Sequence, residues 1–472
     1  MVVQHNMQAA NANRMLNVTT SAQSKSTEKL SSGYRINRAA DDAAGLTISE
    51  KMRKQIKGLD RASTNAEDGV SAVQTAEGAL TEVHSMLQRM NELATQSANG
   101  TNSNTDRKAI QDEIDQLTTE IDRVSETTKF NETYLLKGDG AEKEHNVNAH
   151  DAGLDGVTLT DKGDKVEVTL KELKAGDKIS IAGKNYTIGG TSDDVDTLLK
   201  AANITGADGD KVTINGTEYT YYENAVGGDK GFYATQPKAA DKASAKPDYA
   251  DLDAIKKAKN STITAGGKSV TTMGNVIDGV DDKDSSVITA KKAYMLETAE
   301  ILKASGIGAD KAPTATGNDA LDAATNKFSL TKGKVNYNDA LSFNLHVGAD
   351  ADMTNKITVN IDSMNSAGLG VKGIKADTEQ DATYAIDAIA DAISTVSSQR
   401  SALGAVQNRL EHTINNLDNV VENTTSAESR IRDTDMAEEM VNYSKNNILA
   451  QAGQSMLAQA NQSNQGVLSL LQ

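Results

Sequence analysis

Residues with metal-binding or catalytic chemistry are few and widely spaced in this sequence of 472 residues. His145 and His150 lie five positions apart in a segment rich in Gly and Asp, a spacing that places them on neither one helical face nor one strand face. The neighbouring acids Glu142, Glu144 and Asp151 leave a weak metal site as a minor alternative. A zinc protease would need His-Glu-x-x-His on a helix, and the sequence has no such motif. We therefore expect a solvated loop and no metal site.

Other reaction classes also lack their defining residues. The acidic run 278–284 does not follow the pattern of a calcium-binding loop and indicates a solvated turn. No Gly-rich phosphate loop and no Ser-His-Asp arrangement is present, and the absence of cysteine excludes disulfides, thiolate zinc sites and cysteine nucleophiles. We predict a protein that is not an enzyme and that binds no cofactor.

Composition and charge restrict the partners. Aromatic residues make up 3% of the chain and Trp is absent, whereas a compact enzyme of this size has more large side chains in its core. The net charge of −17 argues against nucleic acid, because no basic surplus exists to neutralise phosphates. No apolar run approaches the ~18 residues that span a membrane, and residues 1–12 lack the basic and apolar regions of a secretory signal peptide. We expect no nucleic-acid partner and no membrane insertion.

The elements that must position any functional residue are long helices at the two ends of the chain. Residues 1–136 and 381–472 contain no proline, and apolar residues recur there with the 3–4 spacing of a coiled-coil seam. The N-terminal seam comprises Leu59, Ala62, Ala66, Gly69, Val73, Ala76, Leu80, Val83, Leu87, Met90 and Ala94. The C-terminal seam comprises Leu403, Val406, Leu410, Thr413, Leu417, Val420, Thr424, Ala427 and Ile431. Because each narrow seam needs a partner, we predict that the two pair as one rod; an ordinary globular helical bundle is the alternative.

The extreme ends differ from the rod in their charge. Residues 1–24 carry one charged Lys, Arg, Asp or Glu side chain, and residues 446–472 carry none. A solvated monomeric helix normally shows charges on its wet face, so this pattern predicts packing against other copies of the chain. A membrane-surface helix is disfavoured by the lack of Lys and Arg. The residues that we expect to carry polymerisation are Met7, Leu16, Ile448, Met456, Leu468 and Leu471.

The middle of the chain, residues 141–340, changes to a β-type pattern. The segments 178–188, 211–221 and 262–271 form an approximate repeat in which alternating β-formers surround a Gly-containing turn. Asn215-Gly216 is the clearest of these turns. A short helix is expected over 193–202. We predict a small α+β insert in one or two lobes.

Several motifs at the two ends resemble those of one family. Residues 30–53 read LSSGYRINRAADDAAGLTISEKMR, and residues 403–416 read LGAVQNRLEHTINN before Ser429-Arg-Ile-Arg-Asp-Thr-Asp435. The end of the chain contains Ile448-Leu-Ala-Gln-Ala-Gly453 and Val467-Leu-Ser-Leu-Leu-Gln472, and Leu345-His-Val-Gly-Ala-Asp350 precedes Ile357-Thr-Val-Asn-Ile361. Together these segments closely resemble bacterial flagellin. Tyr34, Arg38 and His346 depart from the residues more usual in that family.

The resemblance implies a mainly α fold in which the N- and C-terminal segments pair as a long antiparallel helical coiled-coil rod with a β-hairpin. It implies filament-core helices at 1–44 and 433–472, and a rod domain with the hairpin at 45–140 and 341–432. The segment 141–340 would be a variable, surface-exposed α+β or β-rich outer insert.

The function implied by the resemblance is that of a structural subunit of the extracellular bacterial flagellum, which polymerises for motility and leaves the cell by type III export. Its implied partners are other copies of itself, a flagellar export chaperone, and the filament cap and junction proteins. Two alternatives stay open: a hook–filament junction protein, and a filament subunit whose insert is an adhesin or glycan-binding module.

The resemblance also implies recognition of the free monomer by the host Toll-like receptor 5. The matching residues are Leu87, Gln88, Arg89, Glu92 and Leu93 in the first rod helix and Glu113 in the next. The alternative is that these residues serve only subunit packing within the filament.

Overall fold

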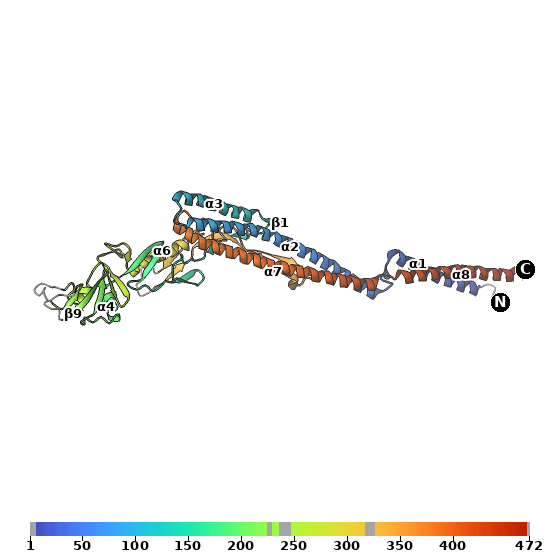
Figure 1. Ribbon diagram of the computed structural model, residues 1–472. Coiled ribbons are helices and arrows are strands. Elements are labelled where there is room, and N and C mark those ends of the chain that lie inside the picture. Colours follow the sequence, from blue (N-terminus) through green and yellow to red (C-terminus); the bar gives the residue numbers. More distant parts are fainter. Residues whose placement is uncertain (1–5, 224–228, 236–246, 317–325, 470–472) are drawn as a thin grey trace. The chain divides into compact units, whose positions relative to one another are not determined.

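The computed structural model describes residues 6–223, 229–235, 247–316 and 326–469, and its ribbon is drawn in Figure 1. Its α-helices are α1 (Met7–Ser32), α2 (Ala43–Ser97), α3 (Asn104–Thr127), α4 (Ser192–Ala201), α5 (Leu252–Lys256), α6 (Ala290–Ala304), α7 (Glu379–Arg432) and α8 (Met436–Ser469). Along the sequence, long helices at both ends flank a β-rich middle, as predicted.

The strands fall into one large sheet and several small ones. The large sheet has the order β10-β9-β8-β11-β12-β7-β15-β14-β13, with β6 paired to β7; the others are β16-β17-β5-β4, β18-β3, β19-β20 and β1-β2. The strands up to β9 are β1 (Lys129–Phe130), β2 (Thr133–Tyr134), β3 (Asp139–Asn146), β4 (Thr158–Asp161), β5 (Lys165–Thr169), β6 (Lys178–Ile181), β7 (Lys184–Gly190), β8 (Lys211–Ile214) and β9 (Thr217–Tyr222). The later strands are β10 (Gly231–Tyr233), β11 (Ser261–Ala265), β12 (Lys268–Thr272), β13 (Val276–Ile277), β14 (Val280–Asp281), β15 (Val287–Ile288), β16 (Thr314–Thr316), β17 (Lys327–Thr331), β18 (Lys334–Asp339), β19 (Leu341–His346) and β20 (Lys356–Ile361).

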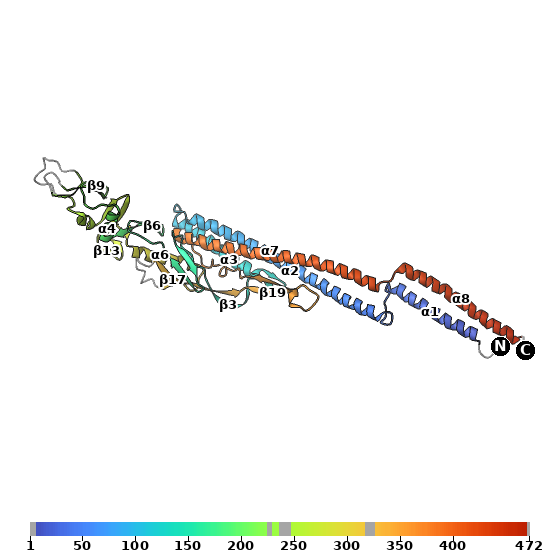
Figure 2. The same cartoon turned by 90° about the horizontal axis from the view of Figure 1, so that it is seen from below.

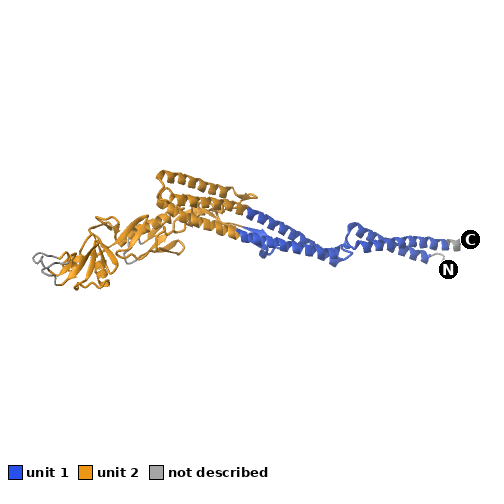
Figure 3. Cartoon of the chain, viewed as in Figure 1, with its two compact units in different colours: residues 1–74, 343–359, 403–472 blue, residues 75–342, 360–402 orange. Residues whose placement is uncertain are grey.

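The chain forms two compact units, which Figure 3 colours separately. The first unit comprises residues 1–74, 343–359 and 403–472, and the second comprises residues 75–342 and 360–402. Both α2 and α7 contribute residues to each unit. These units follow packing and differ from the three-part division drawn from the sequence, which stays a prediction.

Within the first unit, α2 and α7 pair along the predicted seam. Leu59 and Ala62 pack with Leu417, while Ala66 packs with Leu410. Residue numbers rise along α2 as they fall along α7, so the two helices are antiparallel. The Ser63 hydroxyl lies 3.1 Å from Asp418 Oδ1 in a hydrogen bond beside this seam.

Within the second unit, the same pairing continues at Glu77, whose carboxylate lies 2.7 Å from an Arg400 guanidinium nitrogen. Leu80, about one helical turn further along α2, is completely buried. All eleven residues of the N-terminal seam are buried, whereas the C-terminal seam is buried at Leu403, Leu410 and Leu417 and half-buried elsewhere. The predicted pairing of the two ends of the chain is therefore confirmed.

The predicted hairpin near residue 350 is formed by β19 and β20. Val347 and Ile357 pack into the same cluster as Ala66 and Leu410, so the hairpin covers the α2–α7 pair within the first unit. Asn65 Nδ2 donates a hydrogen bond of 2.9 Å to the carbonyl of His346, which fixes the hairpin to α2.

The three repeated segments form the hairpins β6–β7, β8–β9 and β11–β12. Their two-residue turns are Ala182-Gly183, Asn215-Gly216 and Gly266-Gly267, and all six residues have positive φ angles between 51° and 83°. Such angles define a type I′ turn, whose twist matches that of the strands it joins. The expected short helix is α4, which begins one residue earlier than predicted.

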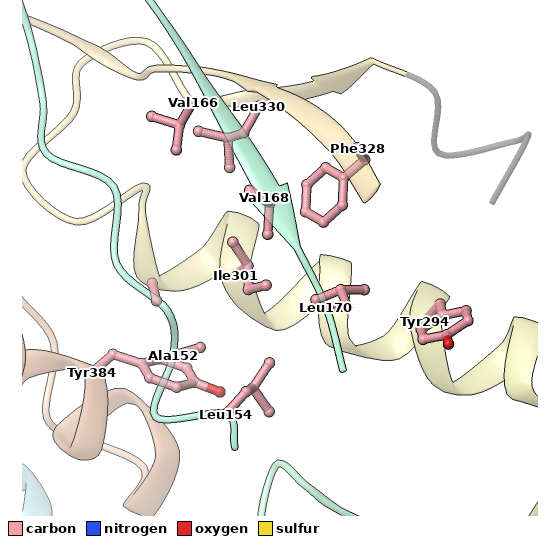
Figure 4. Packing of buried hydrophobic residues seen from close by; sticks show 11 residues of the cluster. Ala152, Leu154, Val166, Val168, Leu170, Tyr294, Ile301, Phe328, Leu330 and Tyr384 are labelled. Atoms are coloured by element: carbon pink, nitrogen blue, oxygen red, sulfur yellow. The ribbon is translucent and has the colours of Figure 1, made fainter. Parts of the chain in front are cut away.

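A second hydrophobic core lies between α6 and the sheet β16-β17-β5-β4. In Figure 4, Val168, Phe328 and Leu330 from this sheet point toward Ile301 of α6, all of them buried. Tyr384 of α7 belongs to the same cluster, so the insert is anchored on the first turns of that helix. The sequence reading did not predict α6 or this sheet.

Candidate interaction surfaces

The two terminal helices, α1 and α8, lie side by side in Figures 1 and 2. Asn6 Nδ2 donates a 3.2 Å hydrogen bond to the carbonyl of Ala460, and a Cβ placed on Gly453 would stand 3.4 Å from Leu16 Cδ1. Ala and Gly along this contact permit close approach, so the helices pair through small side chains. We define α1 and α8 together as the terminal pair.

The terminal pair leaves most of its apolar residues exposed. Of the predicted polymerisation residues, Met7 is 75% exposed, Ile448 67% and Met456 62%, while Leu16 is half-buried against α8. The side chain of Leu468 and the whole of Leu471 lie outside the described residues. Further exposed apolar side chains on the same two helices are Met15, Val18, Met440, Val441 and Leu449.

Burial within the terminal pair is correspondingly slight. Among its described side chains, those that are fully buried are Ser26 and Ala450. An apolar surface of this extent on a single molecule normally marks an interaction site. The geometry therefore provides a long surface, with almost no charge at residues 7–24 and 446–463, that a further apolar surface could cover.

The connections α1–α2 and α7–α8 meet in a small cluster that we call the clasp, formed by Gly33–Arg35 and Arg432–Thr434. The Arg35 N–H donates to the carbonyl of Arg432 over 2.7 Å, and the Thr434 N–H donates to the carbonyl of Gly33 over 3.0 Å. The Arg432 guanidinium lies 4.8 Å from the centre of the Tyr34 ring and 2.9 Å from a Glu50 oxygen. Cation–π and charge-assisted contacts thus converge on one arginine.

The stretch predicted to bind a receptor divides into exposed and buried residues. Arg89 is half-exposed and forms ion pairs with Glu113 of α3 at 2.9 Å and with Glu92 at 3.2 Å. The hydrogen bond to Glu113, followed by that to Glu92, raises the pKa of Arg89. Gln88 is exposed and forms a hydrogen bond with the His84 ring. Leu87 and Leu93 are buried in the packing of the second unit, so the accessible part of the stretch is polar.

The structure offers no support for metal chemistry at the two histidines. His145 stacks on Tyr337, with ring centroids 4.0 Å apart, and faces Asp339 at 3.3 Å. The backbone N–H of His150 donates to the Ser305 hydroxyl. Within the described residues, no group of three or more His, Cys, Asp or Glu side chains is arranged to hold a metal ion.

The acidic run 278–284 forms a turn around one buried carboxylate. Asp281 accepts backbone N–H groups from Gly274, Lys283 and Asp284 at 2.5–3.1 Å. Burial opposes ionisation of Asp281, but these three donors outweigh it and hold its pKa below the ordinary value. The oxygens of Asp281 are thus occupied by hydrogen bonds within the turn, which indicates a structural role and not cation binding.

Glu297 of α6 is a buried titratable group that the sequence pattern does not indicate. Its residue is 1% exposed, and its Oε2 atom has no hydrogen-bond partner. Desolvation raises the pKa of Glu297 to about 7, and the nearby Lys171 opposes that shift only in part. The next acid on the same helix, Glu300, is instead hydrogen-bonded to Tyr384 of α7. The helical pattern around residue 297 gives no signal that a carboxyl group is buried there.

Comparisons with known proteins match both ends of the chain to one family and extend over nearly its full length. The sequence pattern of the bacterial flagellin N-terminal helical region matches residues 3–141, and that of the C-terminal helical region matches residues 386–471. Flagellin of Clostridium tyrobutyricum is 41% identical over 470 residues, which are 98% of this chain and 100% of the relative. Flagellin C of Vibrio cholerae is 35% identical over 469 residues, 99% of both chains.

Among solved structures, FliC from Burkholderia pseudomallei is 20% identical, with a TM-score of 0.26 over 72% of this chain and 99% of that one. In the described part of this chain, no helix is both long and apolar enough to cross a membrane.

Proposed function

Because this chain belongs to the bacterial flagellin family, it is a structural subunit of the extracellular flagellar filament, and we propose that the terminal pair carries its polymerisation. The family is structural, and we propose no catalytic activity. A hook–filament junction protein is not favoured, since the relatives from Clostridium tyrobutyricum and Vibrio cholerae, which match nearly the full chain, are flagellins.

The observation that carries the proposal is the exposure of Met7, Ile448 and Met456 within two stretches, residues 1–24 and 446–472, that together carry one Lys, Arg, Asp or Glu side chain. Burying an apolar side chain of this size contributes about 1.5–3 kcal/mol, and neighbouring subunits would bury many at once. Uncharged polar residues between them avoid the repulsion that like charges would cause in a dense array of copies. We assign 1–44 and 433–472 to the filament core, 45–140 and 341–432 to the rod, and 141–340 to the outer surface.

The test is elongation of fragmented filaments by purified monomer. We expect Ile448→Asp and Met456→Asp each to abolish growth, because either carboxylate would be buried without a partner. Deleting residues 446–472 should have the same effect. The matched control is Ile277→Asp, which charges a side chain that is 63% exposed on the insert, and it should elongate normally. Normal growth of both terminal variants would refute the proposal.

We propose further that the free monomer is recognised by Toll-like receptor 5 through Gln88, Arg89, Glu92 and Glu113. A half-exposed arginine held by two carboxylates is a preorganised anchor, and arginine is enriched at interface hot spots. Leu87 and Leu93 would act by packing α2 beneath this surface.

Arg89→Ala should weaken receptor binding by roughly 2 kcal/mol, or about thirtyfold, as expected for a hot spot. The control is Arg123→Ala on α3, which removes an arginine of comparable exposure that is paired with Glu120. Equal loss in both variants would indicate a general charge effect, and no loss in Arg89→Ala would remove this assignment.

The exposed apolar residues of the terminal pair also provide a surface for the export chaperone and for the cap and junction proteins. We propose that α8 is covered by a flagellar export chaperone before assembly and that filament cap and junction proteins contact the terminal pair. The monomer and the chaperone, mixed and separated by size, should form a complex that Met440→Asp with Val441→Asp weakens, since both residues are exposed on α8. An unchanged complex would exclude this part of α8.

A further inference from the structure

Two Asn-Gly dipeptides occur in the chain, Asn99-Gly100 and Asn215-Gly216, and the structure holds their side chains in opposite ways. An asparagine followed by glycine is the sequence most prone to deamidation, because glycine leaves its own N–H open to approach the asparagine side chain. Both asparagines are exposed, so accessibility does not distinguish them.

Asn215 is restrained. It occupies the first position of the β8–β9 turn, and its Oδ1 atom accepts the N–H of Thr262 over 2.8 Å. Its Nδ2 atom donates to the Ser261 hydroxyl over 3.3 Å. Both ends of the amide are thus turned toward strand β11, so the side chain must break two hydrogen bonds before it can approach Gly216.

Asn99 lies in the turn between α2 and α3, with its side chain folded over the following residue. Its Oδ1 atom accepts the N–H of Thr101 over 3.2 Å, an arrangement known as an Asx turn. The turn brings the side-chain carbonyl over the Gly100 peptide, and the Thr101 N–H would stabilise negative charge developing on Oδ1.

A carboxylate completes this arrangement. Glu379 at the start of α7 lies beside Gly100, with its Oε2 atom 3.5 Å from the point where a Gly100 Cβ would stand. Glu379 is exposed and faces Arg107 at 3.9 Å. This places a carboxylate beside the residue whose N–H must lose its proton in the reaction.

We propose that Asn99 is a site of spontaneous deamidation built into the α2–α3 turn, with Glu379 as the base, and that Asn215 is protected. The Gly100 nitrogen attacks Asn99 Cγ and loses its proton to Glu379. As the tetrahedral intermediate collapses, the amide NH2 group takes up that proton and leaves as ammonia, which gives a succinimide. Water opens the ring at either carbonyl to give aspartate or isoaspartate at this position. The new carboxylate would lie near Arg107, whose Nη2 atom donates a 3.1 Å hydrogen bond to the backbone carbonyl of Asn99.

The test follows both sites in one sample by peptide mass spectrometry during incubation of the folded monomer at neutral pH. We expect Asn99 to react at least roughly tenfold faster than Asn215, the ratio that two ordinary hydrogen bonds at Asn215 predict. In urea, where neither turn persists, the two rates should converge. Equal rates in the folded protein, or a faster reaction at Asn215, would overturn the proposal.

The role of Glu379 has a separate readout. Glu379→Gln should slow the reaction at Asn99 and leave the rate at Asn215 unchanged. It should also make the rate at Asn99 rise more steeply with pH near neutrality, because hydroxide must then remove the proton that the carboxylate accepted. The control Gln380→Glu alters the charge at the neighbouring position and should not slow Asn99. If Glu379→Gln leaves the rate and its pH profile unaltered, Glu379 is not the base.

Discussion

Gly69 of α2 lies so close to Leu345 of β19 that a Cβ at position 69 would overlap the Leu345 Cδ1 atom. It would also stand 3.3 Å from Leu410 Cδ1 on α7. Glycine at this point of the seam is therefore what lets the hairpin and the two helices meet in one cluster.

Gly69→Ala should destabilise the monomer by about 1–3 kcal/mol, since leucine side chains from two elements must move to admit the methyl group. The matched control is Gly78→Ala in the same helix, where a Cβ would have no neighbour within 4 Å. That change should stabilise the protein by about 0.5–1 kcal/mol through helix propensity. Thermal unfolding followed by circular dichroism measures both, and effects of the same sign would contradict the packing described.

Glu297→Gln should alter the dependence of stability on pH. Burial raises the pKa of Glu297 from 4.5 to about 7, so the folded chain binds the proton more tightly than the unfolded chain. The stability of the native protein should therefore fall as pH rises from about 4.5 to about 7 and remain lower above that range.

The glutamine variant removes this titration. At pH 8 it should exceed the native protein in stability by up to roughly 3 kcal/mol, and at pH 4 the two should be similar. Glu172→Gln, which alters an exposed acid, serves as the control. Melting curves of both proteins across this pH range provide the measurement. If the stabilities of the native protein and of Glu297→Gln changed with pH in parallel, the assignment would be wrong.

Asp281→Asn should weaken the turn at 278–284. The amide has one accepting oxygen in place of two and would direct an N–H toward one of the donors, at a cost of about 1–3 kcal/mol. The lowered pKa means that the contribution of Asp281 is present above its unfolded pKa near 3.8 and is lost as pH falls through the folded value. Asp282→Asn should have little effect in the same unfolding experiment, because Asp282 accepts a single 3.3 Å contact, from the Asn275 N–H, which the remaining amide oxygen can still accept.

Tyr34→Leu should loosen the clasp while leaving the helices intact. Loss of the cation–π contact with Arg432 is worth about 0.5–1 kcal/mol, which corresponds to a two- to fivefold faster local opening. Hydrogen exchange of the Thr434 N–H, which is bonded to Gly33, reports that opening directly. Arg38→Ala removes an exposed ion pair with Glu28 and should leave Thr434 exchange unaltered.

The elements that could be predicted from the sequence are those with a strong local pattern of residues. Leu59 to Ala94 could be assigned to a buried seam because eleven apolar residues repeat with one spacing, and the turn at Asn215 could be assigned because its dipeptide has few other conformations. Pairing of β7 with β12 and β15, which is parallel, depends on residues more than 80 positions apart and leaves no such local signal. Leu87 and Leu93 were placed in a receptor-binding stretch by family resemblance, which identifies positions but does not report their burial.

The hydrogen bond between Ser63 and Asp418 joins residues 355 positions apart, and that separation constrains the order of folding. A newly made chain exposes the apolar stripe of α2 long before α7 has been synthesised, so the rod cannot close until nearly the whole polypeptide exists. Closing so large a loop is entropically costly and slows folding.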